Sequence, residues 1–304
     1  MRIATLLPSA TEIVCALGLG DQLVGVSQSC DYPDWVSRLP RLTSTRVPSD
    51  VDSESIDAYV RDSLDDHDAL YDLDMAALTA ARPDVIVSQA LCDVCAVATG
   101  DVEAAVCGLP GNPTLIDLTP NTLDDVFDDI RRVGDTLNAT REANELVTHL
   151  AQRRERVAAV SESIEDTNKP RVAFVEWLIP PFNGGHWNPE LVRLAGGKNL
   201  LGTAGDASTT LSWPMIVDLQ PEVLFIACCG FDVQRTLQDV ELMQQEPFWN
   251  QIPAVRHGRV YVSDGNAFFS CPSPRLIDGL EIMAHAFHPE LYAAPANPAT
   301  VIQP

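Results

Sequence analysis

Short apolar runs alternate with segments of helical periodicity along most of the chain. The apolar runs predict buried strands over 2–7, 23–27, 84–89, 114–118, 171–177, 222–228 and 259–263. The periodic segments predict helices between them, including 102–109, 188–195, 233–245 and 273–287. Regular alternation of strand and helix is typical of an α/β protein with parallel sheets.

The segment 122–165 has helical periodicity, with Gly134 as its main interruption. A flexible linker would be rich in Gly, Ser or Pro, so this connection is predicted to be one long, stiff helix. It separates two α/β lobes, 1–121 and 166–290, and a proline-rich tail, 291–304, that we expect to be loose. The predicted fold is therefore two doubly wound α/β lobes bridged by one long helix, with a ligand cleft between the lobes.

The first 20 residues, "MRIATLLPSATEIVCALGLG", have one basic residue and then a mostly apolar stretch, as a secretion signal does. Polar residues and Pro8 interrupt that stretch, and Ser9 with Glu12 matches a helix capping box. We therefore expect the first strand and helix of the fold here, and a cytoplasmic protein. An extracytoplasmic location is the alternative, if the start of the sequence has been placed too late.

The chain carries 43 acidic against 20 basic residues. This balance disfavours nucleic acid and anionic membrane surfaces as partners, because both are bound by clustered Lys and Arg. No apolar stretch is long enough for membrane insertion. The acidic, lysine-poor composition resembles that of proteins adapted to high salt.

Eight cysteines in a chain of this length do not indicate the disulfide framework of a small secreted protein. Three of them, Cys30, Cys92 and Cys95, follow strands of the first lobe. They are consistent with buried inert thiols, with a metal or cofactor site, or with a redox C-x-x-C pair. The sequence leaves these three possibilities open.

Ligands of open α/β sheets bind beyond the carboxyl ends of the strands, so the segments there are candidate binding loops. Those segments are rich in aromatic residues, although aromatics make up only 6% of the chain. Clustered with Gly, Asn and Pro, they suggest a platform for a large, flat, partly apolar ligand. The aromatic residues in or near these loops are Tyr32, Tyr71, Trp177, Phe182, Trp187, Trp213, Phe231, Phe268 and Phe269.

The sequence contains none of the G-x-S-x-G, Walker, H-E-x-x-H or G-x-G-x-x-G motifs. The sequence offers helix N-termini and dispersed aromatic residues but no pair of a nucleophile and a base. This favours a binding protein over an enzyme.

Four passages taken together match a known family: "LLPSATEIVCALGLGDQLVGVSQSCDYP", "LYDLDMAALTAARPDVIVSQALCDVCAV", "VEWLIPPFNGGHWNPELVRLAGGKNLLG" and "DGNAFFSCPSPRLIDGLE". Over about residues 2–289 the chain resembles the substrate-binding proteins of ABC importers for cobalamin and iron–siderophores, of class III architecture. It resembles the cobalamin-binding branch most, in a subset without an export signal.

The resemblance implies a corrinoid held between the lobes, with no cofactor required, and an ABC permease as a partner of a monomeric protein. It implies docking through Asp74 on the first lobe, whereas Pro214 occupies the corresponding acidic position of the second. Together with the strand-end reasoning, it gives the candidate ligand-binding residues Pro8, Ser9, Ala10, Thr11, Tyr32, Tyr71, Trp177, Phe182, His186, Trp187, Trp213, Asp264, Asn266 and Phe268.

Three functions therefore follow from the sequence. The first is a non-enzymatic protein that binds cobalamin or a related corrinoid, for an importer or as an intracellular carrier. The second is a metal, haem or iron-chelate binder that uses Cys30, Cys92 and Cys95, with His186 as a further metal-ligand candidate. The third is a thiol-dependent enzyme that modifies a corrinoid.

Overall fold

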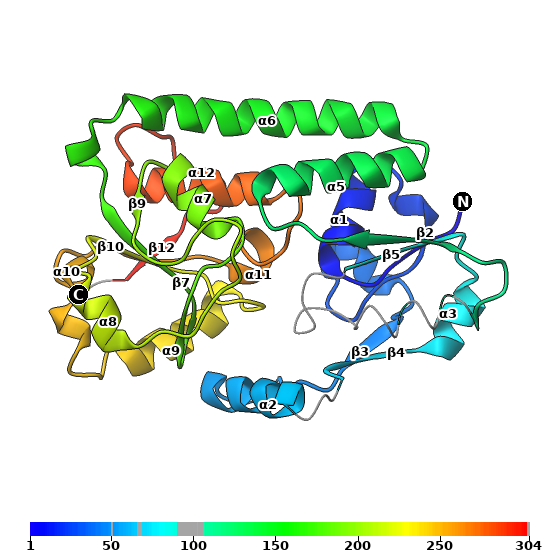
Figure 1. Cartoon of the computed structure of the whole chain (residues 1–304), viewed down its shortest axis with the longest axis horizontal. Coiled ribbons are helices and arrows are strands. Elements are labelled where there is room, and N and C mark those ends of the chain that lie inside the picture. The colour runs from blue at the N-terminus through cyan, green and yellow to red at the C-terminus, as the bar shows by residue number, and fades with distance from the viewer. Residues whose placement is uncertain (50, 66–68, 90–101, 103–105, 107, 303–304) are drawn as a thin grey trace. The chain divides into compact units, whose positions relative to one another are not determined.

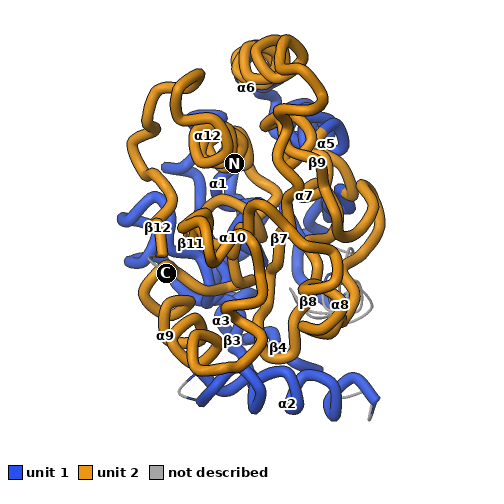
Figure 2. Tube along the Cα trace, turned by 90° about the vertical axis from the view of Figure 1, so that its left-hand side faces the viewer, with its two compact units in different colours: residues 1–120, 124–147 blue, residues 121–123, 148–304 orange. Residues whose placement is uncertain are grey.

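The computed structural model describes residues 1–49, 51–65, 69–89, 102, 106 and 108–302. The chain divides into two compact units (Figure 2). Unit 1 comprises Met1–Pro120 and Asp124–Val147, and unit 2 comprises Asn121–Leu123 and Thr148–Pro304. Each unit contains a largely parallel sheet with helices, which confirms the α/β class.

Unit 1 is built on a parallel sheet with strand order β2-β1-β5-β6. The strands are β1 (Ile3–Thr5), β2 (Leu23–Gly25), β5 (Val85–Gln89) and β6 (Thr114–Leu118). β1 and β5 are buried along their whole length, which explains why their sequences are apolar runs rather than alternating patterns. The unit also contains a small antiparallel pair, β3 (Thr43–Thr45) and β4 (Tyr71–Leu73), and the helices α2 (Ser53–Asp65) and α3 (Met75–Ala81).

Helix α1 (Pro8–Ala16) follows β1 directly and begins earlier than predicted. Leu7 is the N-cap in an extended conformation, and Pro8 occupies the first helical turn, where its missing N–H costs nothing. Ser9 lies inside the helix and no side chain caps it, so the predicted capping box of Ser9 and Glu12 is wrong.

The segment predicted as one helix over 122–165 is two helices, α5 (Leu123–Thr136) and α6 (Thr140–Ser163). Asn138 ends α5 in the left-handed region, with φ of 58°. Gly134 permits the tight turn, because a Cβ there would lie 2.4 Å from the Cβ of Ala143 on α6. The chain passes from unit 1 to unit 2 within the 24-residue helix α6.

Unit 2 contains a sheet with strand order β12-β11-β10-β7-β8, and β9 (Lys198–Asn199) pairs with β7 off this path. The central strands β7 (Arg171–Leu178), β10 (Val223–Ile226) and β11 (Val260–Val262) are parallel. The flanking strands β8 (Pro181–Asn183) and β12 (Thr300–Ile302) are antiparallel to their neighbours.

Helices cover both faces of this sheet. Figure 1 shows α7 (Asn188–Leu194) and α12 (Leu276–Phe287) on one face, and α8 (Trp213–Asp218) and α9 (Val233–Met243) on the other. Ala173 and Val175 of β7 join the apolar cluster that includes residues of α8 and α9. Phe174, between them in sequence, stacks on Phe225 with ring centroids 5.8 Å apart. The remaining short helices are α10 (Pro253–Arg256) and α11 (Gly265–Phe268).

The tail predicted to be loose is held to unit 2 at two places. Residues 300–302 form β12, which pairs with β11 in the register Val260↔Ile302. The Tyr292 hydroxyl donates a hydrogen bond to the Val157 carbonyl at 2.9 Å and lies 2.7 Å from the Ser161 hydroxyl. The prediction of a loose segment over 291–304 is therefore wrong for its described part.

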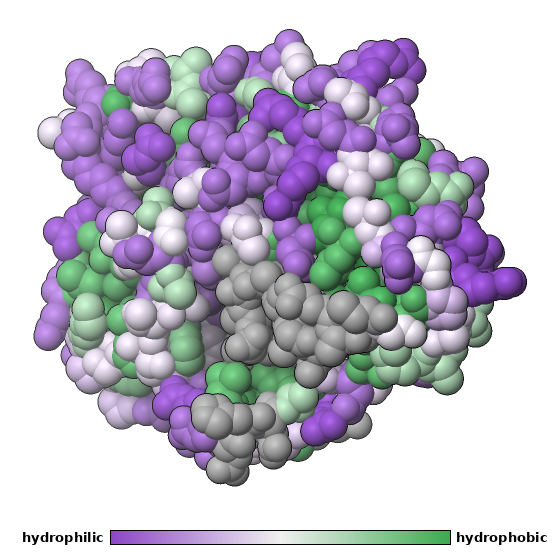
Figure 3. All heavy atoms as spheres, turned by 45° about the vertical axis from the view of Figure 1, so that its right-hand side comes forward, coloured by the Kyte–Doolittle hydropathy of each residue, from purple (hydrophilic) through white to green (hydrophobic). Residues whose placement is uncertain are grey.

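In the described part of the chain, no helix combines the length and the apolar character that crossing a membrane requires. Figure 3 shows one face of the molecule, on which hydrophilic residues are widespread and hydrophobic areas are smaller. This surface agrees with the acidic composition of the sequence.

Candidate functional site

In unit 1, the carboxyl end of β1 leads into α1, and a chain of buried hydroxyl and thiol groups lies beside this junction. The Thr5 and Thr11 hydroxyl oxygens are 2.6 Å apart, and the Thr11 hydroxyl lies 3.0 Å from the Cys30 sulfur. Ser9, Ala10 and Thr11 are all buried, and within the described residues the Ser9 hydroxyl has no hydrogen-bond partner. Pro8 is half-buried, so the predicted binding residues 8–11 form a mostly interior helix start.

Cys30 is a core residue of unit 1. Its side chain is buried, and its sulfur also lies 3.3 Å from the Ser27 hydroxyl. Burial raises the pKa of the Cys30 thiol, although hydrogen bonds from Ser27 and Thr11 oppose this shift. A thiol held in its neutral form is a poor metal ligand, because metals bind the thiolate.

The other two predicted metal ligands, Cys92 and Cys95, lie outside the described residues. So do Cys107 and half of the helix predicted over 102–109. Among the residues that are described, no group of three or more His, Cys, Asp or Glu side chains is arranged to hold a metal ion.

Two predicted aromatic residues of unit 1 differ in exposure. Tyr32 is 45% exposed, whereas Tyr71 is half-buried and packs against the apolar cluster that contains Leu42 and Leu78. Asp74 is exposed and caps α3, since its carboxylate accepts a hydrogen bond from the Ala77 N–H at 2.8 Å. Its place in the fold is therefore that of a helix N-cap on the surface.

In unit 2, three half-buried aromatic rings follow one another across the strand ends of the sheet. Phe182 of β8 pairs directly with Trp177 of β7, which places both side chains on the same face. The Trp177 ring in turn contacts Phe231, with centroids 4.8 Å apart. We call Phe182, Trp177 and Phe231 the aromatic row.

The row is held in place by polar contacts. The indole N–H of Trp177 donates to the Ile179 carbonyl at 3.1 Å. The Arg235 guanidinium lies over the Phe231 ring, 4.3 Å from its centroid, and pairs with the buried Asp239 carboxylate at 3.0 Å. Such an arrangement fixes the rings before any ligand binds, which lowers the entropy cost of binding.

A polar loop between β8 and α7 lies next to the carboxyl end of β7. The Glu176 carboxylate accepts hydrogen bonds from the Gly185 N–H at 3.1 Å and the Asn188 amide at 3.4 Å. Burial raises the pKa of Glu176, whereas hydrogen bonds from Ser208, Gly185 and Asn188 lower it. Gly185 must be glycine, because a Cβ would lie 2.4 Å from the Ser208 nitrogen.

His186 is held in the left-handed region in this loop, with φ of 53°. The backbone N–H of His186 donates to the Asp206 carbonyl at 2.6 Å, and the backbone carbonyl of His186 accepts from the Gly205 N–H at 2.9 Å. Burial lowers the pKa of the imidazole, so the side chain is neutral near pH 7. The loop therefore presents His186 as a half-buried, uncharged polar group.

The predicted loop 264–269 begins beyond the carboxyl end of β11. Asp264 caps α11 by accepting from the Ala267 N–H at 2.7 Å, and Asn266 is half-buried. Phe268 is 8% exposed, and the Arg275 guanidinium lies 5.7 Å from its ring centroid. Phe269 is fully buried and packs on Phe174 and Phe225, so it is a core residue rather than a ligand contact.

Two further predicted binding residues are also core residues. Trp187 is 3% exposed and donates its indole N–H to the Phe269 carbonyl at 2.8 Å. Trp213 is 7% exposed, donates to the Leu178 carbonyl and stacks on Phe248. Trp187 is the N-cap residue of α7 and Trp213 is the first residue of α8, so neither ring lies in an open loop; their contact with a ligand stays a prediction.

Sequence reasoning groups Phe231 with the loop aromatics but misses Arg235 and Asp239. These two residues lie four positions apart on α9 and are one helical turn from each other, as is common for helical ion pairs. The signal in the sequence is Phe231 followed at i+4 by Arg235, across the helix start that Asp232 caps.

Comparison with known proteins gives consistent results over nearly the whole chain. The vitamin B12-binding protein of Vibrio parahaemolyticus is 23% identical over 93% of this chain and 88% of its own length. Among solved structures, the periplasmic vitamin B12-binding protein BtuF of Vibrio cholerae has a TM-score of 0.67 at 21% identity, covering 94% of this chain and 96% of its own. A periplasmic haem-binding protein from Pseudomonas aeruginosa has a TM-score of 0.73 at 20% identity, covering 100% and 99%.

The solved structures share the fold of class III periplasmic binding proteins, which confirms the predicted architecture. The family and its neighbours are non-enzymatic substrate-binding proteins, and this confirms the prediction of a binding protein. The family model for "Periplasmic binding protein" matches residues 3–267. The chain therefore belongs to the periplasmic binding protein family.

Proposed function

We propose that this protein binds cobalamin or a related corrinoid, as the substrate-binding component of an ABC-type importer. The observation that carries the proposal is the aromatic row of unit 2, at the strand ends where α/β sheets bind ligands. Three half-buried rings supply flat apolar surface, which suits contact with a large macrocycle.

Charge favours a corrinoid over haem as the ligand. The periphery of a corrinoid carries mainly neutral amides, whereas haem carries two carboxylates. Two arginines near the strand ends are committed to partners: Arg41 donates to the Ser27 and Cys30 carbonyls, and Arg235 pairs with Asp239. The same segments carry Asp31 and Asp264, so ligand carboxylates would meet like charge.

The names of the relatives favour a corrinoid but leave haem as an alternative. Several similar sequences are named vitamin B12-binding proteins, whereas the solved structures include both B12-binding and haem-binding proteins. A haem ligand is therefore the second candidate, and the experiment must separate the two.

Calorimetric titration of the purified protein with cyanocobalamin and with haemin tests the proposal. We expect cyanocobalamin to bind at least about tenfold more tightly than haemin, because a like-charge penalty of about 1.4 kcal/mol already gives that factor. Tighter binding of haemin than of cyanocobalamin would show that haem, and not a corrinoid, is the preferred ligand. Binding of neither compound to correctly folded protein would remove the proposal.

A pair of matched variants tests the aromatic row itself. Phe231 and Phe248 are both half-buried and both pack against the same apolar cluster, but only Phe231 belongs to the row. We expect Phe231→Leu to weaken cyanocobalamin binding about tenfold and Phe248→Leu to change it less than twofold. Equal effects of the two substitutions would mean that the row does not contact the ligand.

A permease partner follows from the proposed importer role, with Asp74 as the candidate docking residue. Because Asp74 caps α3, an alanine there would disturb the helix as well as the charge. Asp74→Asn keeps a capping side chain and removes the charge. We expect it to leave cyanocobalamin affinity unchanged and to lower uptake through the cognate permease; unchanged uptake would exclude Asp74 from docking.

A further inference from the structure

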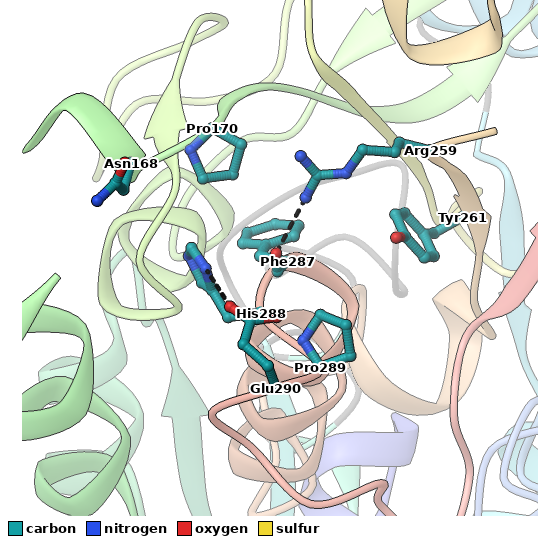
Figure 4. A pocket seen from close by; sticks show the side chains of 8 residues that line it. All are labelled: Asn168, Pro170, Arg259, Tyr261, Phe287, His288, Pro289 and Glu290. Atoms are coloured by element: carbon teal, nitrogen blue, oxygen red, sulfur yellow. Dashed lines mark hydrogen bonds and ion pairs between the residues drawn. The ribbon is translucent and has the colours of Figure 1, made fainter. Parts of the chain in front are cut away.

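Unit 2 has a hollow of about 350 Å³ at the opposite edge of its sheet from the aromatic row (Figure 4). Pro170 precedes the first residue of β7 and Arg259 precedes the first residue of β11, so these lining residues mark the amino ends of the strands. The end of α12 supplies another wall through Phe287. The hollow is therefore separate from the candidate site at the carboxyl ends.

Arg259 and Tyr261 are two of the hydrogen-bond donors that line this hollow. The Arg259 guanidinium donates through Nη2 to the Phe287 carbonyl at 3.0 Å. Among residues 108–302 and the other described ranges, the structure gives this guanidinium no second partner. Figure 4 shows the Tyr261 hydroxyl turned towards the Phe287 side, and no hydrogen bond of this hydroxyl is found within the described residues.

Half of the remaining lining is apolar, because Asn168, His288 and Glu290 are polar or charged. Phe287, Pro170 and Pro289 supply the apolar half (Figure 4). The Arg259 guanidinium and the Tyr261 hydroxyl line the same hollow, and such donors suit the two oxygens of a carboxylate. The apolar side chains of Pro170, Phe287 and Pro289 could contact a ring or a branched hydrocarbon body attached to that carboxylate.

The rim restricts the charge of the ligand. Glu290 lies at the edge, with its carboxylate 3.8 Å from the His288 Nδ1. The protein is also strongly acidic overall, with a net charge of −23. One negative charge can be met by Arg259, whereas a multiply charged phosphate would be repelled.

We infer that this hollow is a second ligand site, for a small monocarboxylate with an aromatic body. The site is independent of corrinoid binding, because none of its lining residues belongs to the aromatic row. The purely structural alternative is that Arg259 only caps α12 at its carboxyl end, where a cation is favoured. A ligand site predicts saturable binding of a monocarboxylate in a titration, whereas a purely structural role of Arg259 predicts none.

Titration calorimetry with phenylacetate, phenylacetamide and inorganic phosphate tests the site in the full chain. We expect phenylacetate to bind with a Kd in the millimolar range, about −4 kcal/mol, as fits an open site of this size. Phenylacetamide has the same shape without the charge, and we expect it to bind at least about tenfold more weakly. Phosphate has the charge without the ring, and we expect no saturable binding.

Variants connect the signal to the hollow. We expect Arg259→Gln to weaken phenylacetate binding about tenfold, and Tyr261→Phe about threefold with the packing of the ring retained. Arg256→Gln is the matched control, because the Arg256 guanidinium donates to the Asn250 and Gln251 carbonyls and does not line the hollow. It should leave binding unchanged, and cyanocobalamin affinity should be unchanged in all three variants.

Three results would overturn the inference. They are no binding of phenylacetate by the unmodified protein, equal binding of phenylacetate and phenylacetamide, and unchanged binding in both Tyr261→Phe and Arg259→Gln. Should Arg259→Gln fail to fold, Tyr261→Phe still decides, because it removes only a hydroxyl that makes no described hydrogen bond. If Arg259→Gln is less stable and the unmodified protein binds no phenylacetate, Arg259 has only a structural role.

Discussion

The guanidinium of Arg235 lies 4.3 Å from the centroid of the Phe231 ring. Its Nη1 is also 3.0 Å from a carboxylate oxygen of Asp239, whose side chain is only 3% exposed. One arginine thus supports an aromatic ring at the candidate site and neutralises a buried acid. This double role makes Arg235 the link between the stability of unit 2 and the shape of its binding surface.

Replacing Arg235 by leucine is expected to destabilise the protein by about 3 kcal/mol, because the Asp239 charge is left buried without its cation. The double variant Arg235→Leu, Asp239→Leu removes both charges and should recover most of that loss. Both variants should weaken cyanocobalamin binding, since Phe231 loses its support. Urea unfolding and calorimetry measure the two effects. A double variant as unstable as the single one would show that the ion pair is not the cause.

The α/β architecture of this protein could be predicted because burial dictates the sequence pattern. β7 is covered on both faces, so Phe174 and Val175 are both apolar although they point in opposite directions. The division between α5 and α6 could not be predicted in the same way. Its cause is the left-handed Asn138 and the close approach of Ala143 to Gly134, and only tertiary contacts reveal it.

The candidate site was predicted less completely than the fold. Trp177 and Phe182 were predicted as binding aromatics at the strand ends, and both lie half-buried in β7 and β8; their contact with a ligand stays a prediction. Trp187 and Trp213 have the same sequence context but lie in the core, where their indole N–H groups meet carbonyls of Phe269 and Leu178. Whether an aromatic ring is buried or half-buried depends on contacts distant in sequence, and residue type alone does not encode them.

Asp129 is expected to give unit 1 a pH-dependent stability. Burial raises the pKa of this carboxyl to about 6, with Arg132 lowering it and Asp125 raising it further. Because the folded pKa lies above the unfolded one, the stabilisation is present below about pH 4 and is lost as the pH rises through 6. Asp129→Asn should therefore match the unmodified protein at pH 3.5 and exceed its stability at pH 7.5 by about 3 kcal/mol.

Chemical denaturation of both proteins across this pH range checks the Asp129 prediction. Asp128→Asn serves as the control, because the Asp128 side chain is 75% exposed and should change stability by less than about 0.5 kcal/mol. A difference between Asp129→Asn and the unmodified protein that does not vary with pH would contradict the assignment.

Arg153 is expected to hold the second half of α6 against α12. Its guanidinium contacts Asp278 at 2.5 Å and Glu281 at 2.7 Å, and its side chain is 18% exposed. Arg153→Leu should cost about 1–2 kcal/mol of unfolding free energy. Arg141 is 78% exposed and pairs with Glu142. Arg141→Leu should therefore lower the free energy of unfolding by less than about 0.5 kcal/mol.

A double-mutant cycle separates the Arg153 ion pair from side-chain packing. If the pair stabilises the protein, Arg153→Leu and Glu281→Gln should be less than additive in urea unfolding. Strict additivity of the two losses would show that Arg153 acts through its aliphatic stem alone.

The thiols of Cys30 and Cys229 are expected to differ widely in reactivity. Cys30 is buried and its pKa is raised by burial, whereas Cys229 is exposed beyond the end of β10. Iodoacetamide reacts with the thiolate, so Cys229 should be alkylated at least about 100-fold faster in the native protein. Peptide mapping by mass spectrometry after timed quenching gives both rates in one sample. In 6 M guanidinium chloride the two rates should converge, and similar rates under native conditions would show that Cys30 is accessible and available as a ligand.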